Sequence, residues 1–461
     1  MKHKMIKLIA LVLPLCLLLS SCSSYLKQYS SEDEVWYMGF GAVEIALPEE
    51  SEEPLYIAGY RNGYEIEGIL DLPRASAVWM DTGEQGVLLI GIDCVGLGRD
   101  TVEKIRDELN RFCRKRGCVS VNVYATHTHA GIDTLGLWGP VAIDGKNPDY
   151  MENLIAAAVE AAELAYADRS AGKLYYGSTD LGHLLYDSRE PAEFDTDLHQ
   201  IRFVSDDDSK NGIRLLSYAA HAESLRGDNR MLSRDFPGAV ADSIMALCGD
   251  DVMYMPGAVG GLIMTRVVVE PFDAEENMRK TAEQITSAVL SMGDELELPP
   301  RLAISATKIR LPLDNTFFLF AKFLGILNNE VSRGKSDTGY LIHSEVGALT
   351  LGSVTLALIP GEIFPELVSG EGLGEGDPEA LRQIAARYRV EKLLIVGLCN
   401  DELGYIVPPS RFLVNEEMPY IETAVDETGE NHYEETKSVG LRAAEIIAEA
   451  LEKVLRQQQG E

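Results

Sequence analysis

The sequence is poor in cysteine, which limits how the chain can be cross-linked or bind a metal. It has 7 cysteines in 461 residues, and no two are spaced as Cys-x-x-Cys. Beyond Cys22 an odd number remains: Cys94, Cys113, Cys118, Cys248 and Cys399. These cysteines exclude a disulfide framework and a thiolate zinc site. Cys113 and Cys118 could still pair with each other.

Positive charge is also scarce. The chain has 41 lysines and arginines against 73 acidic residues, so its formal net charge is −32. Such an acidic surface argues against nucleic acid as a partner and against broad attraction to anionic lipid. Solubility is a sufficient explanation for it, and no protein partner is predicted.

The apolar run at the N-terminus is too short for a membrane span, and no stop-transfer pattern follows it. Lys2, Lys4 and Lys7 precede the apolar run Leu8–Leu19, and Leu19-Ser20-Ser21-Cys22 resembles a bacterial lipobox. We therefore expect residues 1–21 to be a signal peptide and residues 22–35 a tether. Cys22 would be lipidated, which makes the protein extracytoplasmic and anchored to a bacterial membrane. The alternative is a simple cleaved secretory signal in which Cys22 has no role.

No Pro/Ser-rich linker or fixed-period repeat divides the rest, so we expect one domain over residues 36–461. A buried strand at Gly86–Cys94, an amphipathic helix at Thr101–Arg116 and a strand from Val119 form a strand–helix–strand unit. The prediction is an α/β fold in which a mixed β-sheet is flanked by helices. Phe317–Leu327 is expected to be a core helix or an apolar flap beside an acyl-binding groove. Further helices are expected over Tyr150–Ala165, capped by Asp149, and over about Glu434–Leu455.

The first candidate functional residues follow a predicted strand in the stretch Val119–Thr134. Its strand ends in Thr126-His127-Thr128-His129, and alternation along a strand would place His127 and His129 on the same face. Two neighbouring imidazoles suit a divalent metal, or one ligand and one polarising donor. The alternative is a pair of exposed loop histidines.

Other predicted strands also end in polar residues. Residues 213–220 lead to His221, residues 354–359 to Glu362, and residues 392–399 to the segment that contains Tyr405. Two histidines and a carboxylate form a hydrolytic zinc set with one position left for water. Each of these residues could instead be a satisfied structural group.

Several motifs together resemble those of neutral, non-lysosomal ceramidases. They are THTHAG at 126–131, SYAAHAESL at 217–225 followed by Ser233-Arg234-Asp235 and Gly238, IPGEIF at 359–364, and NDELGYIVP at 400–408. The match runs, with gaps, from about Gly39 to the C-terminus. It implies the α/β fold of that family's N-terminal domain and a zinc-dependent hydrolase of N-acyl amide bonds, with a small-molecule or lipid-like substrate.

The resemblance also implies roles for individual residues. Zn²⁺ would be held by His127, His221, Glu362 and Tyr405. His129 would contact the substrate carbonyl or the tetrahedral oxyanion. Arg189 resembles the family's active-site arginine, and Tyr420, in MPYIET, a second family tyrosine near the scissile amide.

Two departures from the family pattern bear on function. The family's GD-x-SPN motif, whose serine has been assigned a catalytic role, corresponds here to residues 257–261, with Ala258 and Gly260 in place of Asp and Ser. We also expect no C-terminal β-sandwich domain. A metal-activated water can attack a carbonyl without the serine, and Gly260 and Gly261 could let a backbone N–H approach the substrate.

Two alternatives to the amidase therefore remain. One is a non-catalytic envelope lipoprotein that binds a lipid or acyl ligand. The other is a metal-dependent esterase or phosphoesterase with the same ligands.

Overall fold

The computed structural model describes residues 28–49 and 53–460. The predicted signal peptide and Cys22 lie outside these residues. Part of the predicted tether is folded into the domain as a strand. Tyr29–Glu32 forms strand β1, which pairs antiparallel with Arg301–Ile304. The hydroxyl of Tyr29 accepts a hydrogen bond from the Gln85 amide, which holds this strand further.

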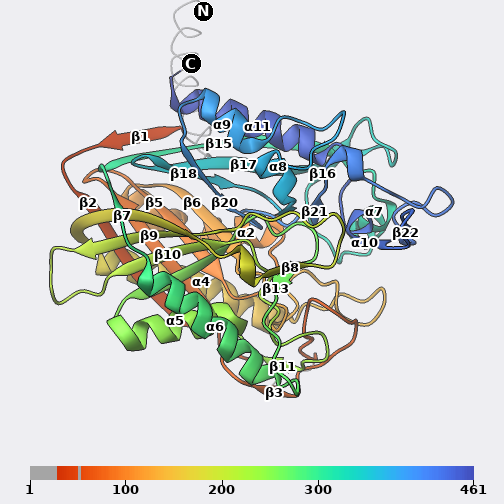
Figure 1. Ribbon diagram of the computed structural model, residues 1–461, viewed down its shortest axis with the longest axis horizontal. Coiled ribbons are helices and arrows are strands. Elements are labelled where there is room, and N and C mark those ends of the chain that lie inside the picture. The colour runs from red at the N-terminus through yellow and green to blue at the C-terminus, as the bar shows by residue number, and fades with distance from the viewer. Residues whose placement is uncertain (1–27, 50–52, 461) are drawn as a thin grey trace, which may run out of the picture.

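Two β-sheets form the centre of the molecule (Figure 1). The nine-stranded sheet has the order β12-β10-β9-β7-β2-β4-β5-β6, with β14 beside β7. Its strands are β2 Trp36–Glu44, β4 Arg74–Asp81, β5 Gly86–Ile92, β6 Cys118–Ala125, β7 Ser170–Asp180, β9 Asp197–Ser205, β10 Ile213–Tyr218, β12 Asp251–Pro256 and β14 Leu296–Leu298. The six-stranded sheet has the order β1-β15-β17-β18-β20, with β16 beside β17. Its further strands are β15 Arg301–Pro312, β16 Val331–Arg333, β17 Tyr340–Leu351, β18 Val354–Leu358 and β20 Lys392–Val396.

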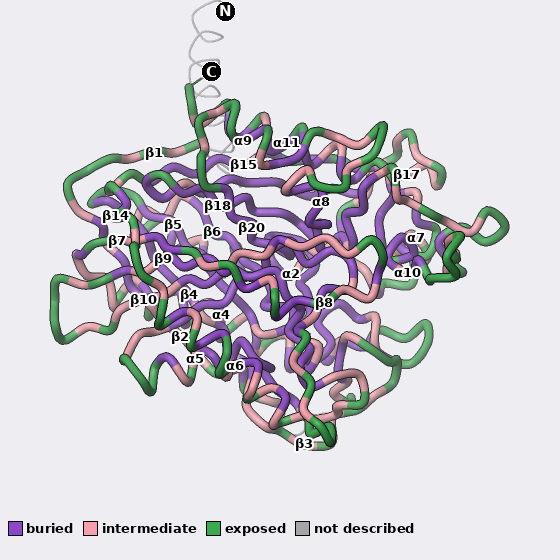
Figure 2. Tube along the Cα trace, in the orientation of Figure 1, coloured by how far each residue is buried: buried purple, intermediate pink, exposed green. Residues whose placement is uncertain are grey.

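The two sheets pack face to face, and their apolar side chains form one core between them. Met38 and Leu89 of the nine-stranded sheet belong to the same buried cluster as Leu349 and Leu356 of the six-stranded sheet. Every residue of β5 and β18 is buried. Strands covered on both faces have near-continuous apolar sequences, which is why GVLLIGI and VTLAL do not alternate. The trace in Figure 2 shows this buried centre.

Helices cover the outer faces and complete a four-layer arrangement. The first group packs on β4, β5 and β6, the second on β10 and β12, and the third on the six-stranded sheet. The first group is α2 Arg99–Glu108, α3 Asn110–Arg116 and α4 Pro148–Asp168; the second is α5 Asp235–Cys248 and α6 Ala274–Ser291; the third is α8 Pro365–Ser369, α9 Leu381–Arg387 and α11 Ala443–Gln458. The predicted α/β fold is confirmed, with two sheets rather than one.

Shorter elements connect these layers. They are β3 Gly68–Ile69, η1 Gly182–Leu184, β8 Leu185–Asp187, β11 Met231–Leu232, β13 Ile263–Thr265, α7 Thr316–Phe323, β19 Glu362–Ile363, β21 Tyr405–Ile406, η2 Pro409–Arg411, β22 Ala424–Val425, β23 Asn431–His432 and α10 Tyr433–Thr436. Among the helices of the described residues, none is long and apolar enough to cross a membrane.

Two predicted helices differ from the observed ones. The helix expected over Thr101–Arg116 is divided at Leu109 into α2 and α3. The helix expected over Glu434–Leu455 is interrupted between α10 and α11, where Gly440 has φ +150° and a Cβ would lie 2.8 Å from Asp314 Oδ2. Close packing against that carboxylate, which a periodic sequence does not reveal, explains the interruption.

Pairs of parallel strands determine where the candidate site residues come together. Within the two large sheets, the parallel pairs are β5 with β6, β10 with β12, and β18 with β20. Their carboxyl ends lead to His127, His221 and Glu362, and the last of these is paired in register with Tyr405 between β19 and β21. Functional groups in α/β folds commonly lie at such strand ends, as the sequence predicted.

Candidate metal centre

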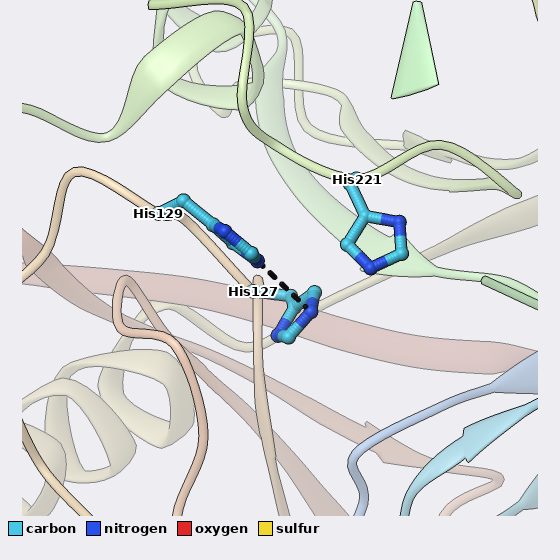
Figure 3. Close-up of side chains that lie close together, drawn as sticks. All are labelled: His127, His129 and His221. Carbon is cyan, nitrogen blue, oxygen red and sulfur yellow. Dashed lines mark hydrogen bonds between the residues drawn. The ribbon is translucent and has the colours of Figure 1, made fainter. Parts of the chain in front are cut away.

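Three histidines from two separate loops meet beyond the strand ends. The ligand nitrogens of His127, His129 and His221 all lie within 4.8 Å of one another, and the Nε2 atoms of His127 and His129 are 3.2 Å apart (Figure 3). His127 and His221 are buried. This cluster could hold a metal ion.

The reason why His127 and His129 converge is not the one predicted. Strand β6 ends at Ala125, and His127 has φ +64°, so strand alternation does not extend to this pair. A turn delivers them instead: the amide of His129 donates to the Ala222 carbonyl at 3.0 Å, and Thr128 bridges Ala222 in parallel. The predicted convergence is therefore found, but a left-handed residue and a contact to the His221 loop produce it.

Backbone carbonyls orient two of the three rings. The Nδ1 atom of His127 is 2.5 Å from the Val95 carbonyl oxygen, and that of His221 is 2.6 Å from the Ile263 carbonyl oxygen. Each contact assigns the proton of a neutral ring to Nδ1 and leaves the lone pair on Nε2. A hydrogen bond of this kind is the usual support for a metal-binding histidine.

Glu362 faces both of these lone pairs. Its Oε2 is 3.0 Å from His221 Nε2 and 3.3 Å from His127 Nε2, and the residue is buried. Burial alone would raise the pKa of Glu362, but His127 and His221 hold it well below its usual range. Burial acts to lower the pKa of His221, but the hydrogen bond to Glu362, the charges of Glu223 and Glu362 and the Ile263 carbonyl together outweigh it and raise that pKa to about 9.

The donor set fits a divalent cation. A lone pair that faces a carboxylate oxygen is repelled unless the ring takes a second proton or a cation lies between them. Two imidazole nitrogens and one carboxylate oxygen at this spacing match the ligand types of zinc in hydrolytic sites.

Tyr405 lies beside Glu362 at the edge of the same site. Its hydroxyl is 3.0 Å from that of Tyr433. Burial raises the pKa of Tyr405 well above its usual range, and the negative charge of Glu362 raises it further. The structure thus brings Tyr405 to the metal-binding residues, as the sequence motif implied, together with Tyr433, which the sequence did not indicate.

His129 differs from the other two histidines in its partners. Its Nδ1 is buried without a hydrogen bond and lies 3.7 Å from Glu223 Oε2. The hydroxyl of Tyr60 donates to the same carboxylate oxygen at 2.6 Å. Burial lowers the pKa of His129 well below its usual range, and the neighbouring histidines lower it further.

The cluster opens into a cavity of about 280 Å³. His127, His129, Glu362 and Tyr405 line it at one place. The apolar lining residues are Val95, Leu135, Leu137, Trp138, Phe318, Leu327, Ile342, Leu403 and Val439. Phe318 is the buried side of α7, whereas Phe320 and Phe323 are exposed. Phe318 and Leu327 of the segment Phe317–Leu327 therefore border the cavity, and α7 forms a helix there, so the segment has features of both expected alternatives, the core helix and the flap.

Two residues with predicted catalytic roles lie outside this cavity lining. Arg189 is buried and pairs with Glu434 at 3.2 Å and Glu435 at 3.0 Å, and its guanidinium lies over the Phe364 ring. Tyr420 is also buried, with its ring 6.3 Å from that of Phe412. In this structure Arg189 is an ion-pair partner next to the Glu362 segment, and the catalytic roles of Arg189 and Tyr420 stay predictions.

Gly260 and Gly261 also lie behind the site and not on the cavity wall. The amide of Gly260 donates to the Ile363 carbonyl at 2.8 Å, so it is engaged by the chain itself. A Cβ at Gly260 would lie 2.4 Å from the amide nitrogen of Phe364. Gly261 has φ +93° and lies against Asp187. These glycines allow the loop to pack against the Glu362 turn.

The order of layers and the buried donor set define an α/β fold of two facing sheets with a candidate metal centre at the strand ends. Among solved structures, the chain is similar to neutral ceramidase from Pseudomonas aeruginosa, with a TM-score of 0.70 and 15% identity, over 92% of this chain and 75% of that one. It is similarly close to a structure described as ceramidase complexed with C2, with a TM-score of 0.69 and 14% identity, over 93% of this chain and 76% of that one. No family model and no curated protein sequence matches the chain. The chain therefore has the neutral ceramidase fold, which confirms the predicted resemblance at the level of structure.

Proposed function

We propose that this protein is a zinc-dependent hydrolase of an N-acyl amide bond, with a ceramidase-like active site. The observation that carries the proposal is the position of the donor set. His127, His221 and Glu362 are buried at the strand ends, and the first and last of them face an apolar cavity.

The residues of this chain suit the steps of amide hydrolysis. A bound zinc ion would supply a water whose pKa is lowered to about 7 and would polarise the carbonyl. His127, His221 and Glu362 would hold the ion, with Tyr405 beside them. His129 is positioned to donate to the oxygen of the substrate carbonyl, and one such donor typically changes the rate by about 10²–10³. No serine is required for this sequence of steps.

The apolar wall supports an acyl chain as the other part of the substrate. Leu135, Trp138, Phe318 and Leu327 present aliphatic and aromatic surface beside the donor set. Both similar structures are described as ceramidases. A lipid-like N-acyl amide fits this combination.

The test is chelator-sensitive turnover. Purified protein is assayed on N-acyl amides and on matched esters of several chain lengths, before and after removal of metal and after zinc is added back. The proposal expects amide hydrolysis that disappears with the chelator and returns with zinc. Turnover of esters alone would instead support the esterase. Ligand binding without turnover of either would support the non-catalytic lipoprotein.

We also propose that Cys22 is lipidated and anchors the protein outside the cytoplasm. The lipobox-like Leu19-Ser20-Ser21-Cys22 motif supports this. Partition of the expressed protein into the detergent phase of a Triton X-114 separation would test it. A Cys22→Ala variant from which the signal peptide has been removed is expected to move to the aqueous phase, and unchanged partition of that processed variant would contradict the anchor.

A further inference from the structure

A second, larger cavity lies next to the catalytic one. Its volume is about 780 Å³, and Gly59, Tyr60 and Tyr433 line both cavities. Tyr60 is connected to the site through Glu223, and Tyr433 through its 3.0 Å contact with Tyr405. A substrate held at the donor set with its acyl chain in the apolar cavity could therefore extend its other half into this second space.

Three arginines line the second cavity, although the chain as a whole carries a net charge of −32. Arg61 pairs with Asp228 at 3.3 Å, with both side chains exposed, and Arg230 pairs with the exposed Glu67. Exposed ion pairs of this kind contribute about 0–1 kcal/mol. A ligand carboxylate or phosphate could thus compete for either guanidinium at small cost.

Arg226 differs because no carboxylate of the described residues forms an ion pair with it. Its guanidinium donates to the Thr265 carbonyl at 3.0 Å and contacts the Met264 sulfur. The side chain is half-buried, so its charge is partly removed from water. A half-buried guanidinium without an anionic partner is suited to bind one, and its planar donors match carboxylate or phosphate.

The backbone fixes Arg226 relative to the catalytic residues. Arg226 has φ +68°, an uncommon conformation for a residue with a side chain, and its amide donates to the Glu223 carbonyl at 3.1 Å. The turn that contains these two residues begins at His221. Strained positions of this kind persist where the surrounding structure enforces them, often at ligand sites.

We propose that the second cavity binds an anionic group on the amine half of the substrate, with Arg226 as the main contact. This rests on the proposed function and makes the substrate class an N-acyl amide of an anionic amine, such as an N-acyl amino acid. Water then cleaves the C–N bond: its hydroxyl joins the acyl carbon, its proton goes to the amine, and the anionic group leaves unchanged on the amine.

Equilibrium binding tests the proposal independently of turnover. Chelator-treated protein is titrated calorimetrically with N-octanoylglycine, with N-octanoyl-phosphoethanolamine and with the neutral N-octanoylethanolamine. One charge-assisted hydrogen bond corresponds to a preference of about 10-fold for the anionic amides. A preference limited to the carboxylate or to the phosphate identifies the source of the anion. Equal affinity for all three overturns the proposal.

Single substitutions test whether Arg226 causes the preference for anionic amides. Arg226→Gln is expected to abolish the roughly 10-fold preference without changing the affinity for the neutral amide, and Arg226→Lys to keep part of it. Arg301→Gln is the matched control, because Arg301 lies at the start of β15, is 62% exposed and pairs only weakly with Glu32 at 3.8 Å. A preference that survives in Arg226→Gln contradicts the assignment of Arg226.

The two proposals fail in distinguishable ways. Chelator-sensitive hydrolysis of the neutral amide, with no preference for the anionic ones, would uphold the hydrolase and overturn the anionic substrate. Arg226-dependent binding of anionic amides, with no hydrolysis of any amide, would uphold the anion site and overturn the hydrolase.

Discussion

At the scale of single residues, the hydrogen bonds of the imidazole rings distinguish the proposed metal ligands from the proposed catalytic donor. His127 and His221 each have Nδ1 on a backbone carbonyl and Nε2 close to Glu362. His129 has no such support, since its Nδ1 lacks a hydrogen bond. Ligands fixed by outer partners are the ones a metal site depends on most. We therefore expect His129 to matter for turnover more than for metal retention.

Replacement of His129 tests this distinction. The His129→Ala variant is expected to keep its zinc, because His127, His221 and Glu362 remain, but to lose about 10²–10³ in kcat with the loss of one oxyanion donor. Zinc content and amide hydrolysis are measured on the same preparation, with the exposed His183→Ala as the control. Loss of zinc together with activity would make His129 a ligand instead.

Gly260 gives a second test at this scale. A Cβ at this position would lie 2.4 Å from Phe364 N and 2.5 Å from Ile363 C, both of them backbone atoms. Gly260→Ala should therefore displace the Glu362 turn, lower the free energy of unfolding by about 1–3 kcal/mol and weaken zinc binding.

Gly293→Ala is the matched control for Gly260→Ala, because nothing lies within 4 Å of a Cβ built there. Urea denaturation and zinc titration of both variants measure the effect. An unchanged zinc affinity in Gly260→Ala would show that this glycine does not position Glu362.

The sequence indicated the candidate metal-binding residues better than the residues that surround them. His127, His221 and Glu362 were accessible to prediction because each follows a buried strand in a recognisable motif. Glu223 and Tyr60 were missed, although Glu223 lies only two residues beyond His221. Tyr60 comes from a segment that forms only isolated bridges near Tyr56 and Ile57, so no periodic pattern connects it to the site.

At the scale of elements, a buried ion-pair cluster connects the helix layer to the six-stranded sheet. Arg99 and Arg106 of α2 contact the two oxygens of Glu345 on β17 at 3.0 Å and 2.6 Å. The Glu345 side chain is 1% exposed. Burial alone would raise the pKa of Glu345, but Arg106 and Arg99 hold it below its usual value.

Removal of this charge should destabilise the fold. Glu345→Gln removes the buried carboxylate that Arg99 and Arg106 share and leaves them only the 42% exposed Glu103 as a charged partner. Breaking a buried pair in this way costs about 3–5 kcal/mol. Glu32→Gln is the control, because Glu32 is 72% exposed and pairs with Arg301 only at 3.8 Å. It should change the unfolding free energy by less than about 1 kcal/mol. Equal effects in the two variants would contradict the role of the cluster.

The same cluster predicts a pH dependence. The pKa of Glu345 is lower in the folded chain than its unfolded value of about 4.3. Its contribution to stability is therefore complete above that value and is lost as the pH falls through the folded pKa. The difference in unfolding free energy between wild type and Glu345→Gln should shrink in acid, as urea titrations between pH 7 and pH 3 would show. A difference that stays constant over this range would rule the linkage out.

Helices and strands could be predicted where the apolar pattern of the sequence is strong. Their exact ends were harder to predict, because tertiary contacts and local capping determine them. The fully buried strands β5 and β18 follow directly from their continuous apolar sequences. The α4 helix was expected to be capped by Asp149, whereas the Asn147 side chain accepts from the Tyr150 amide and Pro148 occupies the first turn. Proline at that position has no N–H to satisfy, so the cap lies one residue before it.

At the scale of the whole molecule, the candidate site depends on two sheets whose strands end at the same place. His127 and His221 follow strands of the nine-stranded sheet, and Glu362 and Tyr405 follow strands of the six-stranded sheet (Figure 1). Sequence periodicity identifies a buried strand but not the sheet to which it belongs. The sequence therefore predicted the convergence of these residues without predicting that the two sheets pack face to face.

The central claim is that residues from both sheets hold one cation. The most direct measurement is the zinc content of purified protein, by mass spectrometry of the metal, in wild type and in the His127→Ala/His221→Ala double variant. We expect about one zinc per folded wild-type chain, since the fixed donor set matches a single zinc site, and none above background in a variant that keeps its far-UV circular dichroism. Equal zinc in the two proteins would contradict the account.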